Sequence, residues 1–228
     1  MSFSRANAKM EMKFRQQRDS AFTLIELLVV IVIIATLMGL AFPAFQAVMN
    51  QARKTQAKND LTQIVTAVNA FYTEYGKYPV TGTGTSDLTF GPSGAPTTNE
   101  TLMDPLRGTE ATPTLNPRQV VFLSPAYVKD STNPRSGVVG TAGATFGQFF
   151  DPWGTNFAIR IDADYSNDIT NPYGANNGAG PATLRQGVIA WSLGKNGALG
   201  GGAAASGFTD ESGTAGVFSG SSDVISWQ

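Results

Sequence analysis

The stretch SAFTLIELLVVIVIIATLMGLAFPAF, residues 20–45, decides how this chain is organised. Almost every side chain from residue 27 to residue 42 is apolar, and a helix over residues 22–45 is long enough to cross a hydrocarbon core of about 30 Å. The stretch carries one charge, Glu26, near its start. Because a carboxylate at membrane depth is costly and usually marks function, the sequence must supply a partner for it.

A basic leader precedes the apolar stretch. Residues 1–21 contain five basic and two acidic residues, which predicts that the N-terminus stays in the cytoplasm and that the rest of the chain is exported. A secretory signal peptide ends in small residues after its apolar part, whereas here the small residues Ser20 and Ala21 come before it. Cleavage at this point would leave the apolar helix at the new N-terminus.

Such cleavage would supply the partner for Glu26. A cut after Ala21 frees an α-amine on Phe22, four residues before the carboxylate. An amine and a carboxylate that enter a low dielectric together are less costly than either alone. If a neighbouring helix is displaced along its axis, its Glu26 meets this amine, and the pair sets the register between subunits. The alternative is an uncleaved signal anchor with Glu26 at the headgroup boundary.

The segment FTLIELLVVIVIIATL, residues 22–37, with its basic leader resembles the processing signal of type IV pilins and of the pseudopilins of type II secretion. The resemblance implies that a prepilin peptidase cuts the Ala21–Phe22 bond, that the Phe22 amine is methylated, and that Glu26 guides assembly into a filament. The family usually has Gly before the cut, and this chain departs from it with Ala21.

A one-sided apolar pattern follows and predicts an amphipathic stalk helix over residues 46–78. Gly76 suits a left-handed cap, and Pro79 cannot continue the helix. Pro43 removes one backbone hydrogen bond and predicts a kink or a locally melted turn. The apolar residues recur at intervals of three and four: Phe45, Val48, Met49, Ala52, Leu61, Ile64, Val65, Val68, Phe71, Tyr72 and Tyr75.

Residues 79–228 form the expected globular head. Residues 80–146 are rich in Gly, Thr, Pro and Ser and predict a variable, surface-facing loop region, with one short helix or strand near residues 118–128. The C-terminal part, residues 147–228, contains a turn at residues 151–154 and strand patterns at residues 156–162 and 186–194. An antiparallel pair of strands packed on the helix stripe gives an α+β fold with one dominant helix, as in pilins.

Composition excludes several classes of function. The chain has no cysteine and no histidine, so thiol nucleophiles, Ser-His-Asp catalysis and ordinary zinc sites are absent. Beyond the leader the chain is mildly acidic, which makes nucleic acid an unsuitable partner. The clustered carboxylates, Asp162 with Asp164 or Asp223, lie in polar, turn-like contexts, so we expect no catalytic site.

The order of DPWG, WSLGKNG and SDVISW resembles the major, G-type pseudopilin, whose loop after the SLG strand binds calcium. By position, the resemblance implies Asn196, Ser222 and Asp223 as calcium ligands, with Asp210 as a replacement oxygen in the longer loop here. Calcium takes roughly six to eight oxygens, and the alternative is a flexible loop with solvated acids. A second acidic group, residues 162–168, lacks the glycine and the glutamate of a helix-loop-helix calcium loop and predicts a polar turn.

These observations predict a subunit of a type II secretion pseudopilus that is anchored in the bacterial inner membrane by one helix, with its C-terminal domain in the periplasm. The resemblance implies that it polymerises with copies of itself, and that prepilin peptidase, the inner-membrane assembly platform and minor pseudopilins are its partners. The alternatives are a type IV pilus major or minor pilin, or a signal-anchored exported binding protein or enzyme. The absence of cysteine argues against the C-terminal disulfide loop common in adhesive pilins.

Overall fold

The computed structural model describes residues 22–81, 84–92, 98–201 and 213–228, apart from the side chains of residues 40, 43 and 44. The chain divides into two compact units, residues 1–47 and residues 48–228. Helix α1 (Leu24–Tyr75) contributes its first part to one unit and the remainder to the other. It is helical through Pro43, so the predicted locally melted turn is absent. Gly76 ends it with φ of 67° and donates its N–H to the Tyr72 carbonyl, as predicted.

The second unit is built on a four-stranded antiparallel sheet with the order β1-β4-β7-β8. Its strands are β1 (Leu88–Phe90), β4 (Ala158–Ile161), β7 (Val188–Ser192) and β8 (Val224–Ile225). The pairing of β4 with β7 is the predicted antiparallel pair, and Ile159 lies opposite Ala190. The predicted α+β class, with a long helix packed on a small antiparallel sheet, is confirmed.

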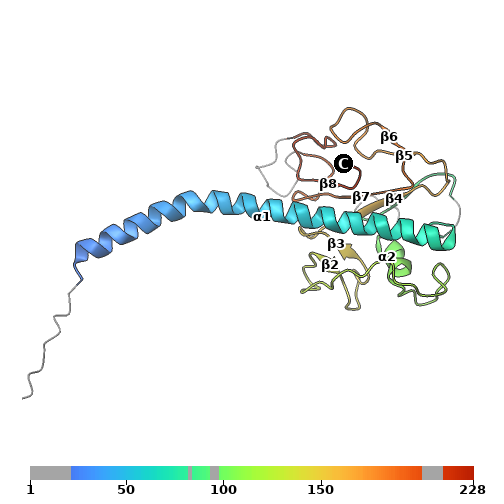
Figure 1. Ribbon diagram of the computed structural model, residues 1–228, viewed down its shortest axis with the longest axis horizontal. Helices are drawn as coiled ribbons and strands as arrows, with labels where there is room; N and C mark the ends of the chain where they lie inside the picture. The colour runs from blue at the N-terminus through green and yellow to red at the C-terminus, as the bar shows by residue number, and fades with distance from the viewer. Residues whose placement is uncertain (1–21, 82–83, 93–97, 202–212) are drawn as a thin grey trace, which may run out of the picture. The chain divides into compact units, whose positions relative to one another are not determined.

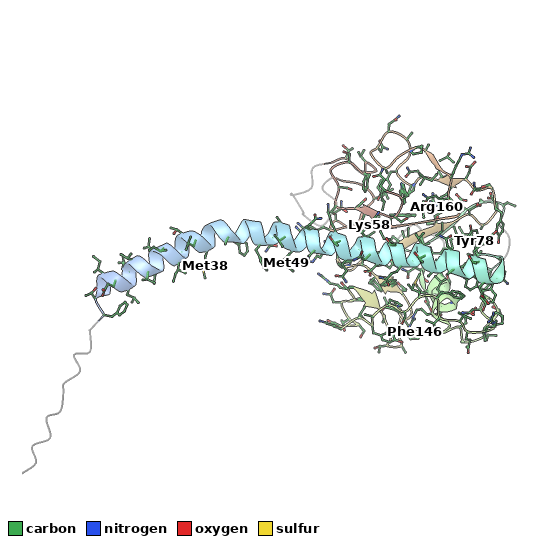
Figure 2. The ribbon with its side chains drawn as sticks, viewed as in Figure 1. Met38, Met49, Lys58, Tyr78, Phe146 and Arg160 are labelled. Carbon is green, nitrogen blue, oxygen red and sulfur yellow. The ribbon has the colours of Figure 1, made fainter. Side chains whose placement is uncertain are left out.

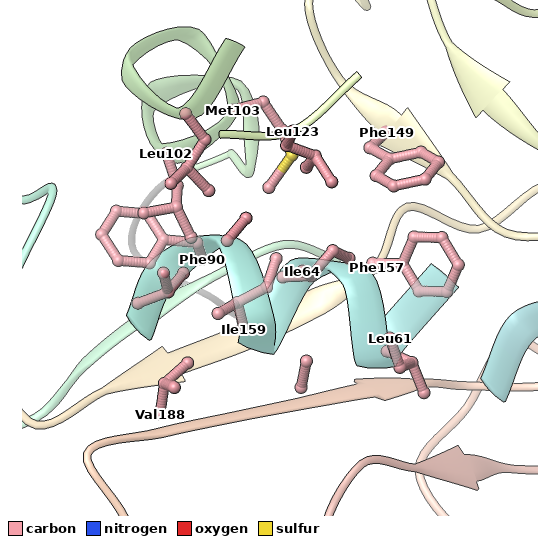
Figure 3. Packing of buried hydrophobic residues seen from close by; sticks show 14 of the residues in the cluster. Leu61, Ile64, Phe90, Leu102, Met103, Leu123, Phe149, Phe157, Ile159 and Val188 are labelled. Atoms are coloured by element: carbon pink, nitrogen blue, oxygen red, sulfur yellow. The ribbon is translucent and has the colours of Figure 1, made fainter. Parts of the chain in front are cut away.

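The main core lies where α1 meets the sheet and α2 (Glu100–Arg107). Figure 3 shows Leu61 and Ile64 of α1 packed among side chains of α2 and of the sheet. In Figure 1 the helix runs between the sheet on one side and α2 with the β2–β3 pair on the other. The strands of that pair are β2 (Gly137–Val138) and β3 (Phe149–Phe150).

A second apolar cluster covers the opposite face of the sheet. Ile189 and Trp191 of β7 pack there with Tyr173, Leu184 and Ile225. A small hairpin of β5 (Ile169–Thr170) and β6 (Thr183–Leu184) contributes to this cover. Ala158 of β4 also belongs to this cluster, so both faces of the sheet are covered.

Two further expectations are corrected. Residues 80–146 are not only surface loops, because they supply strand β1 and helix α2, whose Leu102, Met103 and Leu106 are fully buried. The predicted short element near residues 118–128 is not a helix or strand and contributes one isolated bridge, between Tyr127 and Val138. The apolar stripe of α1 is buried only from Ala57 onward, and the stripe residues before it are exposed: Phe45, Val48, Met49 and Ala52.

Candidate functional site

The start of α1 is fixed by a reciprocal pair of hydrogen bonds between Thr23 and Glu26. The Thr23 backbone N–H and hydroxyl both donate to Glu26 Oε2, at 2.8 and 2.7 Å, and the Glu26 N–H donates to the Thr23 hydroxyl at 3.3 Å. This is a capping box, in which a residue at the helix cap and an acid three positions later satisfy each other's backbone. Glu26 therefore has a partner within its own chain, which the charge argument from sequence overlooked although the T-x-x-E pattern is visible there.

The first unit presents an apolar surface on all sides of α1. Large side chains from Leu24 to Ile34 are about half exposed or more, and Phe22 is 77% exposed. Figure 2 shows side chains around Met38 that project away from the helix. A helix that is hydrophobic all round is a buried or membrane-embedded element in its working state. The apolar side chains of this unit therefore need a partner that covers them.

Of the predicted processing residues, Ala21 lies outside the described residues, and Phe22 directly precedes the capped turn. The described part of the chain contains no helix that meets both the length and the apolarity needed to cross a bilayer. The predicted membrane crossing and the predicted cleavage stay predictions.

The C-terminal loop brings together three of the four predicted calcium ligands. Asp223 is buried, and its Oδ2 accepts hydrogen bonds from the Tyr173 hydroxyl and the Gly200 N–H, both at 2.7 Å. Ser222 Oγ accepts the Lys195 N–H at 2.7 Å. Asn196 accepts the Ala198 N–H at its amide oxygen and donates from its amide nitrogen to the Gly200 carbonyl. Asp210 lies outside the described residues.

The described part of this donor set supplies few of the oxygens that a calcium ion takes. Calcium is held by roughly six to eight oxygens, usually with several carboxylates, and the described ligands include one carboxylate. One side-chain oxygen of each residue already accepts protein N–H or O–H groups: Asn196 Oδ1, Ser222 Oγ and Asp223 Oδ2. The calcium prediction is untested, because Asp210 is not described.

The second acidic group forms the polar turn that the sequence predicted. Asp162 Oδ1 accepts the Ser166 N–H, and Oδ2 accepts the Asn167 N–H at 2.7 Å. Carboxylate oxygens of Asp87, Asp162 and Asp164 lie within 4.8 Å of one another. Burial raises the pKa of Asp87, whereas hydrogen bonds from Ser166 lower that of Asp164. The hydrogen bonds to Asp162 account for this cluster as part of the turn.

Two charged side chains of α1 interact with the rest of the second unit. Lys58, labelled in Figure 2, donates from Nζ to the carbonyl oxygens of Ile225, at 2.7 Å, and of Gln228. Burial raises the pKa of Asp60 to about 6, and the negative charge of Asp151 adds to this effect. Asp151 is fully buried in the predicted turn, and the Ser192 hydroxyl joins it to the strand β7.

Other contacts of this unit were not foreseen from sequence. Asn99 is fully buried, and its side chain donates to the Phe149 and Phe157 carbonyls and accepts the Phe149 N–H. Asn116, also buried, accepts from the Tyr75 hydroxyl and donates to the Pro105 carbonyl. No local pattern marks either residue, since their partners come from distant segments.

Two sequence families match this chain. The family described as "Prokaryotic N-terminal methylation motif" matches residues 16–42, and the family described as "Type II secretion system (T2SS), protein G" matches residues 45–113. The first match spans the predicted cleavage bond, the capping box and the exposed apolar helix. The second spans the part of α1 that packs in the second unit, together with β1 and α2.

Curated relatives agree with these matches. The core protein G of the type II secretion system from Pseudomonas aeruginosa is 36% identical over 82 residues, which is 36% of this chain and 58% of the relative. The corresponding protein from Aeromonas hydrophila is 32% identical over 82 residues, or 36% of this chain and 57% of the relative. The type IV major pilin protein PilA of Myxococcus xanthus is 36% identical over 61 residues, or 27% of this chain and 28% of the relative.

The chain thus spans somewhat more than half the length of the protein G relatives that it matches. No solved structure matches it significantly. These matches confirm the family resemblance that the sequence predicted, because both relatives are named core protein G of a type II secretion system.

Proposed function

We propose that this chain, which is homologous to the core protein G of type II secretion systems through its N-terminal region, is a structural subunit of a pseudopilus. The observation that carries the proposal is the apolar surface of α1 in the first unit, placed directly after a methylation motif. Burying one such side chain stabilises an assembly by about 1.5–3 kcal/mol, and the described part of the chain leaves these side chains exposed.

The proposed sequence of events begins in the bacterial inner membrane, with the C-terminal domain in the periplasm. Prepilin peptidase cuts between Ala21 and Phe22, and the new Phe22 amine is methylated. The subunit then leaves the membrane, and its α1 joins the helical core of a filament made of copies of this chain. The assembly platform and minor pseudopilins take part in this step.

Glu26 has two successive partners in this proposal. Before assembly its carboxylate is occupied by Thr23 at the helix cap. In the filament the Phe22 amine of an adjoining subunit lies beside it, and a paired carboxylate in an apolar core is far less costly than an isolated one. Calcium in the C-terminal loop of the head remains a separate expectation.

The first test combines N-terminal mass analysis with electron microscopy of sheared filaments. We expect the mature chain to begin at a methylated Phe22 and to polymerise. Glu26→Ala should be processed normally and yield few or no filaments. Glu74→Ala is the matched control, because it removes only a surface ion pair with Arg118, worth about 0–1 kcal/mol. Native protein that retains residues 1–21, or normal filaments from Glu26→Ala, would contradict the proposal.

A type IV pilin is the second candidate, favoured by the match to the Myxococcus pilin. That match covers 61 residues, whereas the protein G family continues to residue 113 in the head. Deletion of this protein from the cell distinguishes the two candidates. Loss of protein export with surface fibres intact supports a pseudopilin, whereas loss of surface fibres with export intact supports a pilin.

A further inference from the structure

The second unit carries a groove, here called the basic groove, beside the beginning of its part of α1. The groove has a volume of about 530 Å³ and lies between Gln56 of α1 and the segment 126–136. Lys129 and Arg135 line it and are exposed, and neither forms an ion pair with another described residue. Asp130 is the acidic residue of the lining, so the segment has one positive charge in excess.

An exposed aromatic ring lines the same groove. Tyr127 is 64% exposed, and its hydroxyl accepts a hydrogen bond from the Arg107 guanidinium at 3.2 Å. The Arg107 guanidinium also lies over this ring, 5.6 Å from its centroid. Tyr and Arg are enriched in protein interfaces, so the basic groove has the composition of a docking surface.

The turn at residues 162–168, here called the tip turn, has the opposite charge. It contains three aspartates and no basic residue. Tyr165 in this turn is 45% exposed and has φ of 59°, which is uncommon for a residue other than Gly, and its ring stacks on Tyr78 at 5.5 Å. The hydrogen bonds of Asp162 hold the turn in the conformation in which Asp164 and Tyr165 are exposed to solvent.

The basic groove and the tip turn lie toward opposite ends of the second unit along α1. Gln56 borders the groove, whereas Tyr78, on which the tip turn stacks, follows the last helical residue, Tyr75. A helix rises about 28 Å between positions 56 and 75, at about 1.5 Å per residue. Figure 2 shows Lys58, close to Gln56 in sequence, and Tyr78 toward the two ends of this unit. The two surfaces can therefore meet only between copies that are displaced along the helix axis.

We propose that the tip turn of one copy of this chain docks in the basic groove of the next copy, with Asp164 facing Lys129 and Arg135. A carboxylate pairs with Arg and Lys, and a guanidinium also stacks on an aromatic face such as that of Tyr165. Because the two surfaces differ, the contact is head-to-tail, and head-to-tail contacts that do not close a ring build open helical filaments. The inference rests on the proposed function, and it names a contact between the second units of neighbouring subunits.

Cysteine cross-linking tests this contact, because the chain has no cysteine of its own. Filaments of the full-length protein that carries both Arg135→Cys and Asp164→Cys are treated with a short bifunctional thiol reagent. We expect a ladder of dimers, trimers and longer chains on a denaturing gel, because each copy carries both sides of the contact. Each single variant should stay monomeric. The control, which combines Asp164→Cys with Arg118→Cys outside the groove, should also stay monomeric.

Electron microscopy of the same samples separates this inference from the proposed function. Filaments of the paired variant that give no ladder, or an equal ladder from the Arg118 control, would overturn the inference and leave the proposed function intact. A wild-type protein that forms no filaments would overturn both. If the paired variant does not polymerise, a charge reversal decides.

The charge reversal uses Asp164→Arg and Arg135→Asp. Either change alone brings like charges together, which should lower the filament yield about fivefold, whereas the double variant restores opposite charges and should restore the yield. Both side chains are exposed, so the midpoint of thermal unfolding should stay unchanged in all three variants. Normal yields from the single variants, or no recovery in the double variant, would overturn the proposal.

Discussion

The hydroxyl of Ser192 donates to Oδ2 of the buried Asp151 at 2.6 Å. The other oxygen of the same carboxylate accepts the backbone N–H groups of Trp153, Gly154 and Thr155, at 2.8–2.9 Å. One side chain thus shapes the turn before β4 and fastens it to β7. Burial raises the pKa of Asp151, and these four hydrogen bonds oppose that rise by stabilising the charged form.

Replacing Asp151 by Ala should therefore destabilise the fold strongly. The change leaves three turn amides and a buried hydroxyl without their acceptor, and we expect a loss of about 3–5 kcal/mol in the free energy of unfolding. Asp151→Asn keeps an oxygen for the three amides and should lose less, about 1–2 kcal/mol. Chemical denaturation of the full-length chain in detergent measures both. Equal losses would show that the charge, and not the turn geometry, matters most.

The raised pKa of Asp60 predicts how the stability of the fold changes with pH. Its pKa is about 6 in the folded chain against an ordinary value of 3.8, because it is partly buried and faces Asp151. The folded state therefore binds this proton more tightly than the unfolded state does. The contribution of Asp60 to the free energy of unfolding is therefore fully present below about pH 4. It is lost as the pH rises through about 6.

Asp60→Asn should remove this dependence. Since the carboxylate is partly exposed, solvent screening reduces the effect, and we expect a gain of about 1 kcal/mol above pH 7, or about 2–4 °C in the unfolding midpoint. Near pH 4 the variant and the wild type should unfold at similar temperatures. Measuring the midpoint of both proteins across this pH range is the test, and a variant that is less stable above pH 7 would contradict it.

Lys58 is expected to fasten the C-terminus to α1. Lys58→Met keeps the aliphatic stem and removes the donor to the Ile225 and Gln228 carbonyls, which should cost about 1 kcal/mol. Hydrogen exchange in residues 224–228 should increase as well. The exposed Lys77 provides the control through Lys77→Met, which should alter neither quantity. If both variants exchange alike, the C-terminus is held by its apolar packing alone.

Those parts of the fold that follow a local pattern were predictable. The stop of α1 at Gly76, the strands β4 and β7, and the turn at Asp151 each depend on spacing or on residue types within one short segment. The strand β1 was missed, because three residues are too few to show an alternating pattern. It forms because β4 offers it an edge: Thr89 pairs with Arg160 from 71 positions along the chain.

In the candidate site, too, local patterns were predictable and contacts between distant segments were not. Residue types and order pointed to Phe22 and Glu26, but the partner of Glu26 in the isolated chain is Thr23. In the C-terminal loop, Asp223 was predicted as a calcium ligand, which stays a prediction, whereas Tyr173, its hydrogen-bond partner, was not singled out. Its hydroxyl reaches Asp223 across 50 positions of sequence, and such contacts arise only once the loop has packed on the sheet.

The last prediction separates the two roles of Glu26. Glu26→Gln removes the charge and keeps an oxygen for the capping box, since Gln serves at this position as well as Glu. Thr23→Ala keeps the charge and weakens the cap by about 1 kcal/mol. If pairing with the Phe22 amine drives assembly, Glu26→Gln should be processed and yield few filaments, whereas Thr23→Ala should still polymerise. Mass analysis of the N-terminus checks processing, and filament yield by electron microscopy checks assembly. Normal filaments from Glu26→Gln together with a defect in Thr23→Ala would mean that Glu26 acts through the helix cap instead of through its charge.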